Sequence, residues 1–156
     1  MSEVEKRMSE KGIELPPPPA PMGAYVPAVT TAGGLAFVSG QLPRWGGEMK
    51  FAGKVVAEVS EEDAKKAARL AALNAVSVLK DHLGDLDRVL RIVKLTGSVA
   101  SSSGFVGQPA IINAASDVMV EVFGEKGKHA RMAKGMAELP ARASVAIELI
   151  AEINPE

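Results

Sequence analysis

The longest periodic pattern in the chain is an alanine stripe that predicts a helix from Ser60 to Leu83. Ser60 is a favourable N-cap, and the three acids at 61–63 suit the positive end of a helix dipole. Alanine recurs at helical spacing at positions 64, 67, 68, 71 and 75, and Gly84 is a typical stop. Because alanine side chains are short, this helix can lie close to a flat partner. The pattern therefore predicts a helix packed on a β-sheet.

Segments rich in β-branched residues stand on both sides of this helix. Residues 26–31 and 35–41 predict a hairpin around Gly33 and Gly34, residues 43–53 a loop, and residues 54–59 a short strand. After the helix we expect a strand at 89–99, a second helix from Pro109 to Phe123, and strands at 129–137 and 143–153. The order β-β-β-α-β-α-β-β predicts an α+β fold: a single mixed six-stranded sheet with two helices on one face.

Two helices on one face leave the other face of the sheet bare. Along the strand at 129–137, one side carries residues that are small for a core and too apolar for a fully solvated surface: His129, Arg131, Ala133, Gly135 and Ala137. We expect subunits to associate through this side and to leave clefts between copies. The mean hydropathy of +0.10 also favours some apolar surface buried between subunits.

A length of 156 residues fits one domain with one core. Residues 1–21 are expected to form an N-terminal arm, with a short charged helix and a rigid proline run at 16–19, and residues 22–156 the α+β domain. Ser2 and Glu5 have the spacing of a capping box. We expect the arm to pack on the domain without joining its core.

Composition excludes several classes of chemistry. The chain has no cysteine and only two histidines, so thiolate sites are impossible and a catalytic triad or a histidine-rich metal site is poorly supplied. The net charge of -1 gives no field that attracts nucleic acid. The charged first residues do not look like a signal peptide, and no apolar run is long enough to span a membrane. A cytoplasmic location is therefore predicted, with no membrane partner and no cofactor or metal.

Arg131 is the strongest candidate for ligand binding, because it lies among small apolar residues, where an arginine is unexpected unless a carboxylate or phosphate group binds it. Its guanidinium matches the two oxygens of a carboxylate or a phosphate group. An ordinary strand arginine with a solvated head is the alternative.

Several short motifs occur in an order typical of one family. They are Gly23-Ala24-Tyr25, Val38-Ser39-Gly40-Gln41-Leu42-Pro43, Asn113, Ala130-Arg131 and Leu139-Pro140. With these motifs the chain, from about residue 22 to 152, resembles the Rid (YjgF) family of small trimeric enamine/imine deaminases, whose members are also named endoribonuclease L-PSP. The resemblance implies a chorismate-mutase-like fold and a homotrimer.

The resemblance also implies an active site at each subunit interface. Arg131 then matches the arginine that holds the carboxylate of a 2-imino acid, Tyr25 and Ser39 line the pocket, and Asn113 is a pocket-side asparagine. Gly40 lets the backbone pass close to the ligand. Plain structural roles remain open: Ser39-Gly40 as a strand end, Tyr25 as an interface residue, Asn113 bonded to nearby backbone, and His129 at a rim rather than acting as a base.

Two departures from the family weaken an enzymatic interpretation. Ala133 stands where many of these deaminases have a cysteine, and Ala146 stands where they have the glutamate that handles the catalytic water. Glu148, two residues further along the same strand face, is a candidate replacement acting through a water. The segment around Arg142 also looks like the family's arginine motif, but it leaves only one strand after the arginine, so Arg131 is preferred.

The leading hypothesis is a deaminase of the 2-iminobutanoate/2-iminopropanoate type, which hydrolyses reactive enamines and imines to 2-keto acids and ammonia. The second is a non-catalytic trimer that binds a small carboxylate as a sensor or regulator. The third, an endoribonuclease or translation inhibitor, depends on a local basic cluster (Lys126, Lys128, His129, Arg131 and Lys134) in a chain with few aromatic residues for base stacking.

Overall fold

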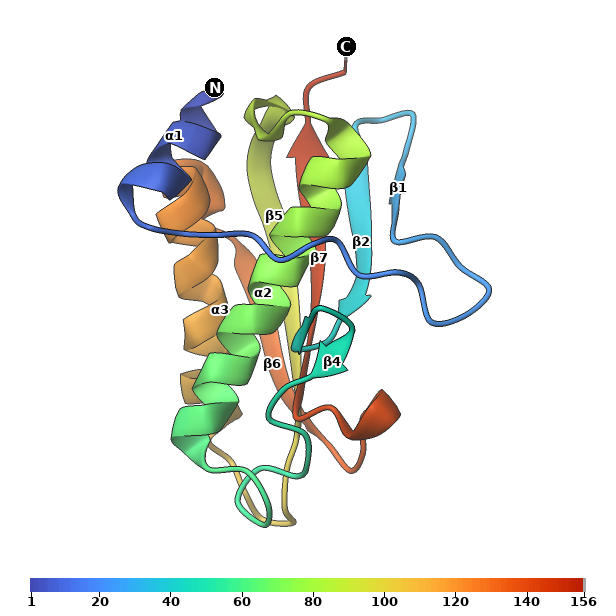
Figure 1. Ribbon diagram of the computed structural model, residues 1–156, viewed down its shortest axis with the longest axis vertical. Helices are drawn as coiled ribbons and strands as arrows, with labels where there is room; N and C mark the ends of the chain where they lie inside the picture. Colours follow the sequence, from blue (N-terminus) through green and yellow to red (C-terminus); the bar gives the residue numbers. More distant parts are fainter. Residues whose placement is uncertain (156) are drawn as a thin grey trace.

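The computed structural model describes residues 1–155 and has two layers, a mixed β-sheet and the helices that cover one of its faces (Figure 1). In chain order its elements are α1 Glu3–Glu10, β1 Ala28–Thr30, β2 Leu35–Gln41, β3 Arg44–Trp45, β4 Glu48–Met49, α2 Glu61–Leu83, η1 Leu86–Arg88, β5 Val89–Ala100, α3 Gln108–Phe123, η2 Gly124–Gly127, β6 Ala130–Met136, η3 Pro140–Arg142 and β7 Val145–Ile153. The three η segments are short 3-10 helices.

The main sheet has the strand order β1-β2-β7-β5-β6. β5 and β6 run parallel, joined by α3 as the crossover, and the other neighbours are antiparallel. α2 crosses in front of the middle of the sheet and α3 lies beside it (Figure 1). The predicted fold class, an α+β mixed sheet with two helices on one face, is confirmed.

The sheet has five strands rather than the six that the sequence predicts. The predicted loop at 43–53 contains a small separate hairpin, β3 and β4, which turns at Gly46 and Gly47 with φ of +60° and +80°. The predicted strand at 54–59 forms only isolated bridges from Val55. Val56 there has a φ of +81°, and a residue in the left-handed region cannot continue an extended strand.

The sequence signals at the helix ends are confirmed. The Ser60 hydroxyl accepts the N–H of Asp63 at 3.1 Å, which caps α2, and Gly84 ends the helix with a φ of +79°. α3 has proline in its first turn and ends at Gly124. These bonds are local, so the sequence reveals them.

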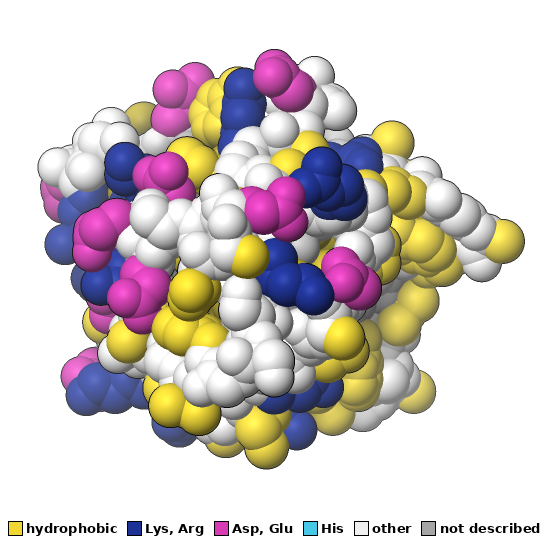
Figure 2. Space-filling model, turned by 90° about the horizontal axis from the view of Figure 1, so that it is seen from below, with side chains coloured by type: hydrophobic (Ala, Val, Ile, Leu, Met, Phe, Trp, Pro, Cys, Tyr) yellow, Lys and Arg dark blue, Asp and Glu magenta, His cyan; other side chains and the backbone are white. Residues whose placement is uncertain are grey.

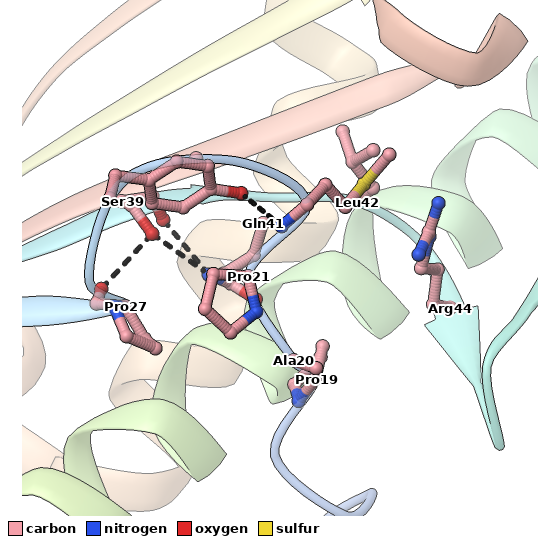
Figure 3. Close-up of a pocket in the computed structure, with 11 residues that line it drawn as sticks. Pro19, Ala20, Pro21, Pro27, Ser39, Gln41, Leu42 and Arg44 are labelled. Carbon is pink, nitrogen blue, oxygen red and sulfur yellow. Dashed lines mark hydrogen bonds between the residues drawn. The ribbon is translucent and has the colours of Figure 1, made fainter.

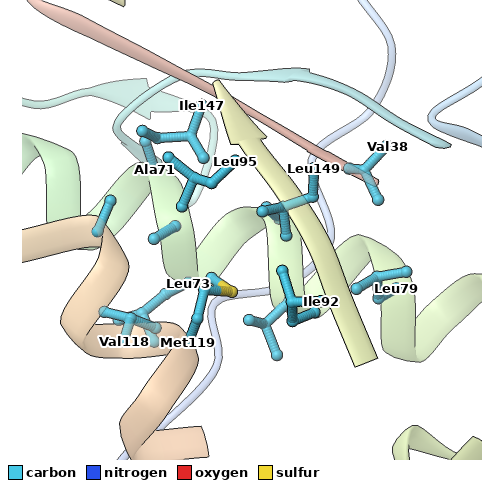
Figure 4. Packing of buried hydrophobic residues seen from close by; sticks show 14 of the residues in the cluster. Val38, Ala71, Leu73, Leu79, Ile92, Leu95, Val118, Met119, Ile147 and Leu149 are labelled. Atoms are coloured by element: carbon cyan, nitrogen blue, oxygen red, sulfur yellow. The ribbon is translucent and has the colours of Figure 1, made fainter. Parts of the chain in front are cut away.

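The core lies between the sheet and the two long helices (Figure 4). Leu95 of β5, Leu149 of β7 and Val38 of β2 are paired neighbours in the sheet and point to the helices. α3 lies very close to β5. A Cβ added to Gly97 would stand only 2.6 Å from the Ile112 side chain of that helix. Close contact of this kind needs a glycine under the helix.

The N-terminal arm is more firmly attached than predicted. Met8 of α1 is 5% exposed and belongs to the main hydrophobic cluster, which corrects the expectation that the arm stays outside the core. The predicted capping box of Ser2 and Glu5 is present. Further along, the Pro16 carbonyl accepts the hydroxyl of Ser77 on α2 at 2.6 Å. The sequence of the arm is charged and rich in proline, so it gave no signal that Met8 packs α1 against the core.

Asp87, in the short helix η1 far along the chain, holds the first turn of α1. Its carboxylate accepts the N–H of Val4 at 2.9 Å and of Glu3 at 2.8 Å, and these bonds lower the pKa of Asp87. A carboxyl whose pKa is lowered by folding stabilises the fold above its unfolded pKa and loses that contribution as the pH falls. The attachment of α1 should therefore weaken below about pH 4.

Asp87→Ala should release α1 at neutral pH, at a cost of about 1 kcal/mol, the usual value of a helix N-cap. Hydrogen exchange of the amides in residues 3–10 should accelerate in this variant, while the sheet amides keep their protection. Asp81→Ala, at an exposed position on α2, is the matched control and should leave exchange unchanged. Equal protection of α1 in Asp87→Ala and wild type would contradict this role.

The sheet face away from the helices carries a mixed surface. Paired residues that point to it include Val29, Phe37, Glu148 and Met132, and all four are exposed. The exposed fractions of Phe37 on β2 and Met132 on the edge strand β6 are 38% and 52%, which are large values for apolar side chains on the face of a sheet. This open face is the surface that another subunit could cover.

Arg131 does not point to that open face, so the sequence prediction chose the wrong side of this strand. Arg131 pairs with Leu95, which is buried under the helices, and Ala133 pairs with Gly97 on the same side. Residues 130, 132, 134 and 136 of β6 point to the open face instead. The small residues are there because α3 lies close: a Cβ on Gly135 would stand 2.7 Å from the Gln108 side chain.

Within residues 1–155, no helix combines the length and the apolar character that crossing a membrane requires.

Candidate functional site

Arg131 lies on β6 at the edge of the sheet, with its guanidinium under the first half of α3. Nη1 donates to Asn113 Oδ1 at 2.7 Å and to Ser116 Oγ at 3.4 Å, and Nη2 makes a long 3.5 Å contact with the Pro109 carbonyl. All of these partners are neutral. No carboxylate within the described part of the chain pairs with Arg131, so its positive charge remains available.

His129 lies two residues before Arg131, just before β6 begins, and adds a further polar side chain to this group. Its Nε2 lies 2.9 Å from Ser116 Oγ and its Nδ1 lies 2.6 Å from the Gly127 carbonyl oxygen. The ring is partly buried. The expectation that His129 is a rim residue rather than a base stays a prediction.

The second predicted group, Tyr25, Ser39 and Gly40, lines one pocket near the end of β2 (Figure 3). The Ser39 hydroxyl donates to the Pro27 carbonyl at 3.0 Å, and Tyr25 Oη accepts the N–H of Met22 at 3.0 Å. Arg44 stands at the far end of this pocket, beyond Leu42 (Figure 3). The cavity has a volume of about 20 Å³, which is room for one water and not for an amino-acid derivative.

Glu148 belongs to this second group. Its side chain is exposed on the open face of β7, and its Cγ would be 3.8 Å from a Cβ on Gly40. Glu148 has no hydrogen-bond partner within residues 1–155, so its carboxylate is open to solvent and to any ligand beside Gly40.

One chain does not bring the two groups together. β5 separates β6, which carries Arg131, from β7, which carries Glu148. The two side chains also leave the sheet on opposite faces, because Arg131 pairs with the buried Leu95 while Glu148 pairs with Thr96 one residue further along β5. A site that uses both Arg131 and Glu148 needs two copies of the chain.

The two alanines that depart from the family pattern are separated in the same way. Ala133 lies under α3 on the side of Arg131, and Ala146 lies on the open face, paired with Ser98. Ala133 shares its sheet row with Gly97 and Ile147, and Ala146 shares its row with Ser98 and Lys134, so neither row holds a thiol or a carboxylate that replaces the missing group. Glu148, on the same face as Ala146, is the nearest carboxylate along β7.

The alternative arginine, Arg142, is already occupied. It lies in the turn η3 with a φ of +59° and forms an ion pair with Glu58. The backbone N–H of Lys54 and the guanidinium of Arg142 together lower the pKa of Glu58. This geometry favours Arg131 over Arg142 as the residue available to a ligand.

The basic cluster expected around residues 126–134 is divided. Lys128 pairs with Glu125 at 2.9 Å, and Lys134 points to the open face while Arg131 points under α3. Seen from below, acidic and basic side chains are mixed without a continuous basic surface on that face (Figure 2). The division of charges does not favour the tracking of a phosphodiester backbone.

Sequence reasoning missed Ser116. It lies one turn after Asn113 on α3, and both contact the same arginine nitrogen. The i, i+3 spacing of these two polar residues on one helix face was the only signal in the sequence. That they both contact Arg131 depends on the packing of α3 on β6.

Comparison with known proteins identifies the family. The family model described as "YjgF/chorismate mutase-like, putative endoribonuclease" matches residues 5–153, which extends the resemblance into the arm helix. Protein TCP17 of Trypanosoma cruzi is 43% identical over 152 residues, covering 97% of this chain and 94% of that protein. The chain belongs to the YjgF (Rid) family.

Solved structures agree with this assignment. The protein Atu1372 of Agrobacterium tumefaciens, described as of unknown function, is 44% identical with a TM-score of 0.87 over 97% of this chain and 92% of its own. A "putative endoribonuclease" from Shewanella oneidensis is 32% identical with a TM-score of 0.92 over 97% and 100%. The YjgF gene product of E. coli, at 24% identity and a TM-score of 0.60 over 88% and 92%, shares the fold.

Proposed function

We propose that this protein hydrolyses small 2-imino and 2-enamino acids to 2-keto acids and ammonia. One observation supports this most: Arg131 presents an unneutralised guanidinium at a sheet edge, held by an amide and a hydroxyl. Such a group suits the carboxylate of a small metabolite, with charge-assisted hydrogen bonds worth roughly 1.5–3 kcal/mol each. A cytoplasmic location stays a prediction.

The site is proposed to form between two copies of the chain. The open sheet face carries exposed apolar side chains, and the cavity beside Ser39 is too small to hold a substrate in one chain. A neighbouring copy would bring its Arg131 and Asn113 to the Tyr25, Ser39, Gly40 and Glu148 of the first. Three copies is the number that the resemblance implies.

The chemistry needs few groups. A water adds to the carbon of the protonated C=N bond and one of its protons passes to the nitrogen; the C–N bond then breaks as Glu148 accepts the remaining hydroxyl proton, which gives ammonia and the keto acid. Arg131 orients the substrate through its carboxylate. One positioned acid/base group contributes about a hundredfold or more. With alanine at 133 and 146, we expect less activity than in relatives that keep both groups.

The direct test follows 2-iminopropanoate, generated in the assay by an amino-acid oxidase, and measures ammonia release with and without the protein. Release above the spontaneous rate, lost on heat denaturation, is the expected result. A rate equal to the spontaneous one with several imino acids would reject the enzymatic proposal.

Mixed oligomers give a sharper prediction. Arg131→Ala and Glu148→Gln should each be inactive alone, because each removes one side of every site. When the two variants are unfolded together and refolded, some interfaces combine an intact Arg131 with an intact Glu148, and activity should return to about a quarter of wild type for random association. Recovery reports a shared site, and its absence would contradict a site between copies.

A non-catalytic carboxylate binder is the second candidate, and Ala133 and Ala146 are the observations that favour it. Titration of pyruvate in a calorimeter, showing saturable binding lost in Arg131→Ala but no imine turnover, would select it. Some relatives are named endoribonucleases, but the basic residues around Arg131 are divided between two faces and an ion pair, which does not favour RNA binding here.

A further inference from the structure

We infer that His129 and Ser116 are positioning residues that aim Arg131 at its ligand, an inference that rests on the proposed carboxylate-binding role of Arg131. The three side chains form one connected path. It runs from the Gly127 carbonyl through the His129 ring and the Ser116 hydroxyl to Arg131 Nη1.

The direction of each hydrogen bond in this path follows from its fixed end. A carbonyl oxygen only accepts, so the His129 Nδ1 at 2.6 Å from the Gly127 oxygen must carry the proton. In the neutral ring Nε2 is then the acceptor, and the Ser116 hydroxyl donates to it across 2.9 Å. Ser116 Oγ therefore turns its lone pairs to the guanidinium, which only donates.

The fixed end is rigid. A Cβ on Gly127 would lie 2.1 Å from the carbonyl oxygen of Met119, so the backbone of residue 127 rests directly on the backbone of α3. The same helix carries Ser116 and Asn113. The path thus starts at backbone that rests on α3 and passes through Ser116 of the same helix before it reaches Arg131, so the position of the histidine ring is determined by packing.

This arrangement decides which edge of the guanidinium is free. Nη1 is taken by Asn113 at 2.7 Å and has a longer contact with Ser116 at 3.4 Å, and the Nη2 contact with the Pro109 carbonyl at 3.5 Å is also longer than a good hydrogen bond. Nε has no partner among residues 1–155. The edge formed by Nε and Nη2 is therefore presented to a carboxylate, whose two oxygens match its two parallel N–H groups.

The neutral character of the path also matters. An aspartate in place of Ser116 or Asn113 would orient the guanidinium equally well but would neutralise its charge. The Ser116 hydroxyl, which also contacts His129, orients Arg131 without supplying a negative charge and leaves the positive charge for a planar 2-imino or 2-keto monocarboxylate.

The test uses the full chain and compares Ser116→Ala and His129→Ala with wild type, by pyruvate titration in a calorimeter and by kinetics with 2-iminopropanoate. Each variant should weaken pyruvate binding and raise KM by about two- to twelvefold, the loss expected for one hydrogen bond of about 0.5–1.5 kcal/mol. Arg131 holds the carboxylate equally before and during the reaction, so kcat should stay within about twofold. His129→Gln, which keeps an acceptor near the Nε2 position, should recover most of the affinity.

Ser77→Ala on α2, the other long helix, is the matched control. It also removes a single serine hydroxyl, which donates to the Pro16 carbonyl at 2.6 Å. It should lower the melting temperature without changing pyruvate affinity. Unchanged affinity in folded Ser116→Ala and His129→Ala, with Arg131→Ala still losing binding, overturns the positioning role alone. Equal affinity of His129→Gln and His129→Ala overturns it as well. If Arg131→Ala itself binds pyruvate like wild type, the proposed function fails instead.

Discussion

Replacing Arg131 by alanine is expected to weaken pyruvate binding by about a hundredfold or more and to reduce imine hydrolysis to the spontaneous rate. Two charge-assisted hydrogen bonds of roughly 1.5–3 kcal/mol each are lost, and a loss of about 2.7 kcal/mol already corresponds to a factor of a hundred. Arg131→Lys should recover only part of the affinity, because an ammonium is a point charge without the planar pair of donors. Calorimetry with pyruvate and an ammonia assay measure the two effects.

Arg142→Ala is the matched control for this prediction. Arg142 is an exposed arginine in the same part of the chain, but it is paired with Glu58. Its removal should leave pyruvate affinity within about twofold of wild type. The opposite pattern, with binding lost in Arg142→Ala and kept in Arg131→Ala, would transfer the carboxylate role to Arg142.

Gly127→Ala is expected to give the largest loss of stability of any glycine-to-alanine change in this protein, because its Cβ would meet the closest contact. The new Cβ would lie 2.1 Å from the Met119 carbonyl oxygen and 2.9 Å from the Val120 nitrogen, both backbone atoms of α3. Side chains cannot rotate away to relieve this contact, so the end of α3 must move from the start of β6. We expect a loss of about 3 kcal/mol and a fall in melting temperature of roughly 10 °C.

Urea unfolding followed by circular dichroism measures this loss. Gly33→Ala is the control, since its Cβ would meet only the Thr31 hydroxyl, at 3.9 Å, in the turn before β2. That change should stay within about 0.5 kcal/mol of wild type. Equal stability of Gly127→Ala and Gly33→Ala would mean that the contact between α3 and residue 127 is not as close as described.

The sequence revealed those parts of the fold that depend on neighbouring residues. The cap at Ser60, the stop at Gly84, the turn at Gly33-Gly34 and the capping box at Ser2 all act over four residues or fewer, and all are present. The hairpin of β3 and β4 was missed, since two-residue strands have no periodicity to detect. The docking of Met8 was missed because its partners lie far along the chain.

For the candidate site, the sequence predicted which residues take part but not how they are arranged in space. The order of the motifs predicts Tyr25, Ser39, Gly40, Asn113 and Arg131 as site residues, and the structure brings Asn113 to Arg131. It also places Arg131 and Glu148 on opposite faces of the sheet, with β5 between their strands.

The sequence by itself determined the helices, the order of the long helices and strands, and the choice of Arg131 as the preferred ligand-binding candidate, because these depend on local periodicity, capping, composition and motif order. Only the tertiary structure decided which face of β6 the helix covers. A strand with small residues on one side and mixed residues on the other is compatible with either orientation. The pairing of Leu95 with Arg131 and the close approach of α3 select one of them, and both are contacts between segments distant in the chain.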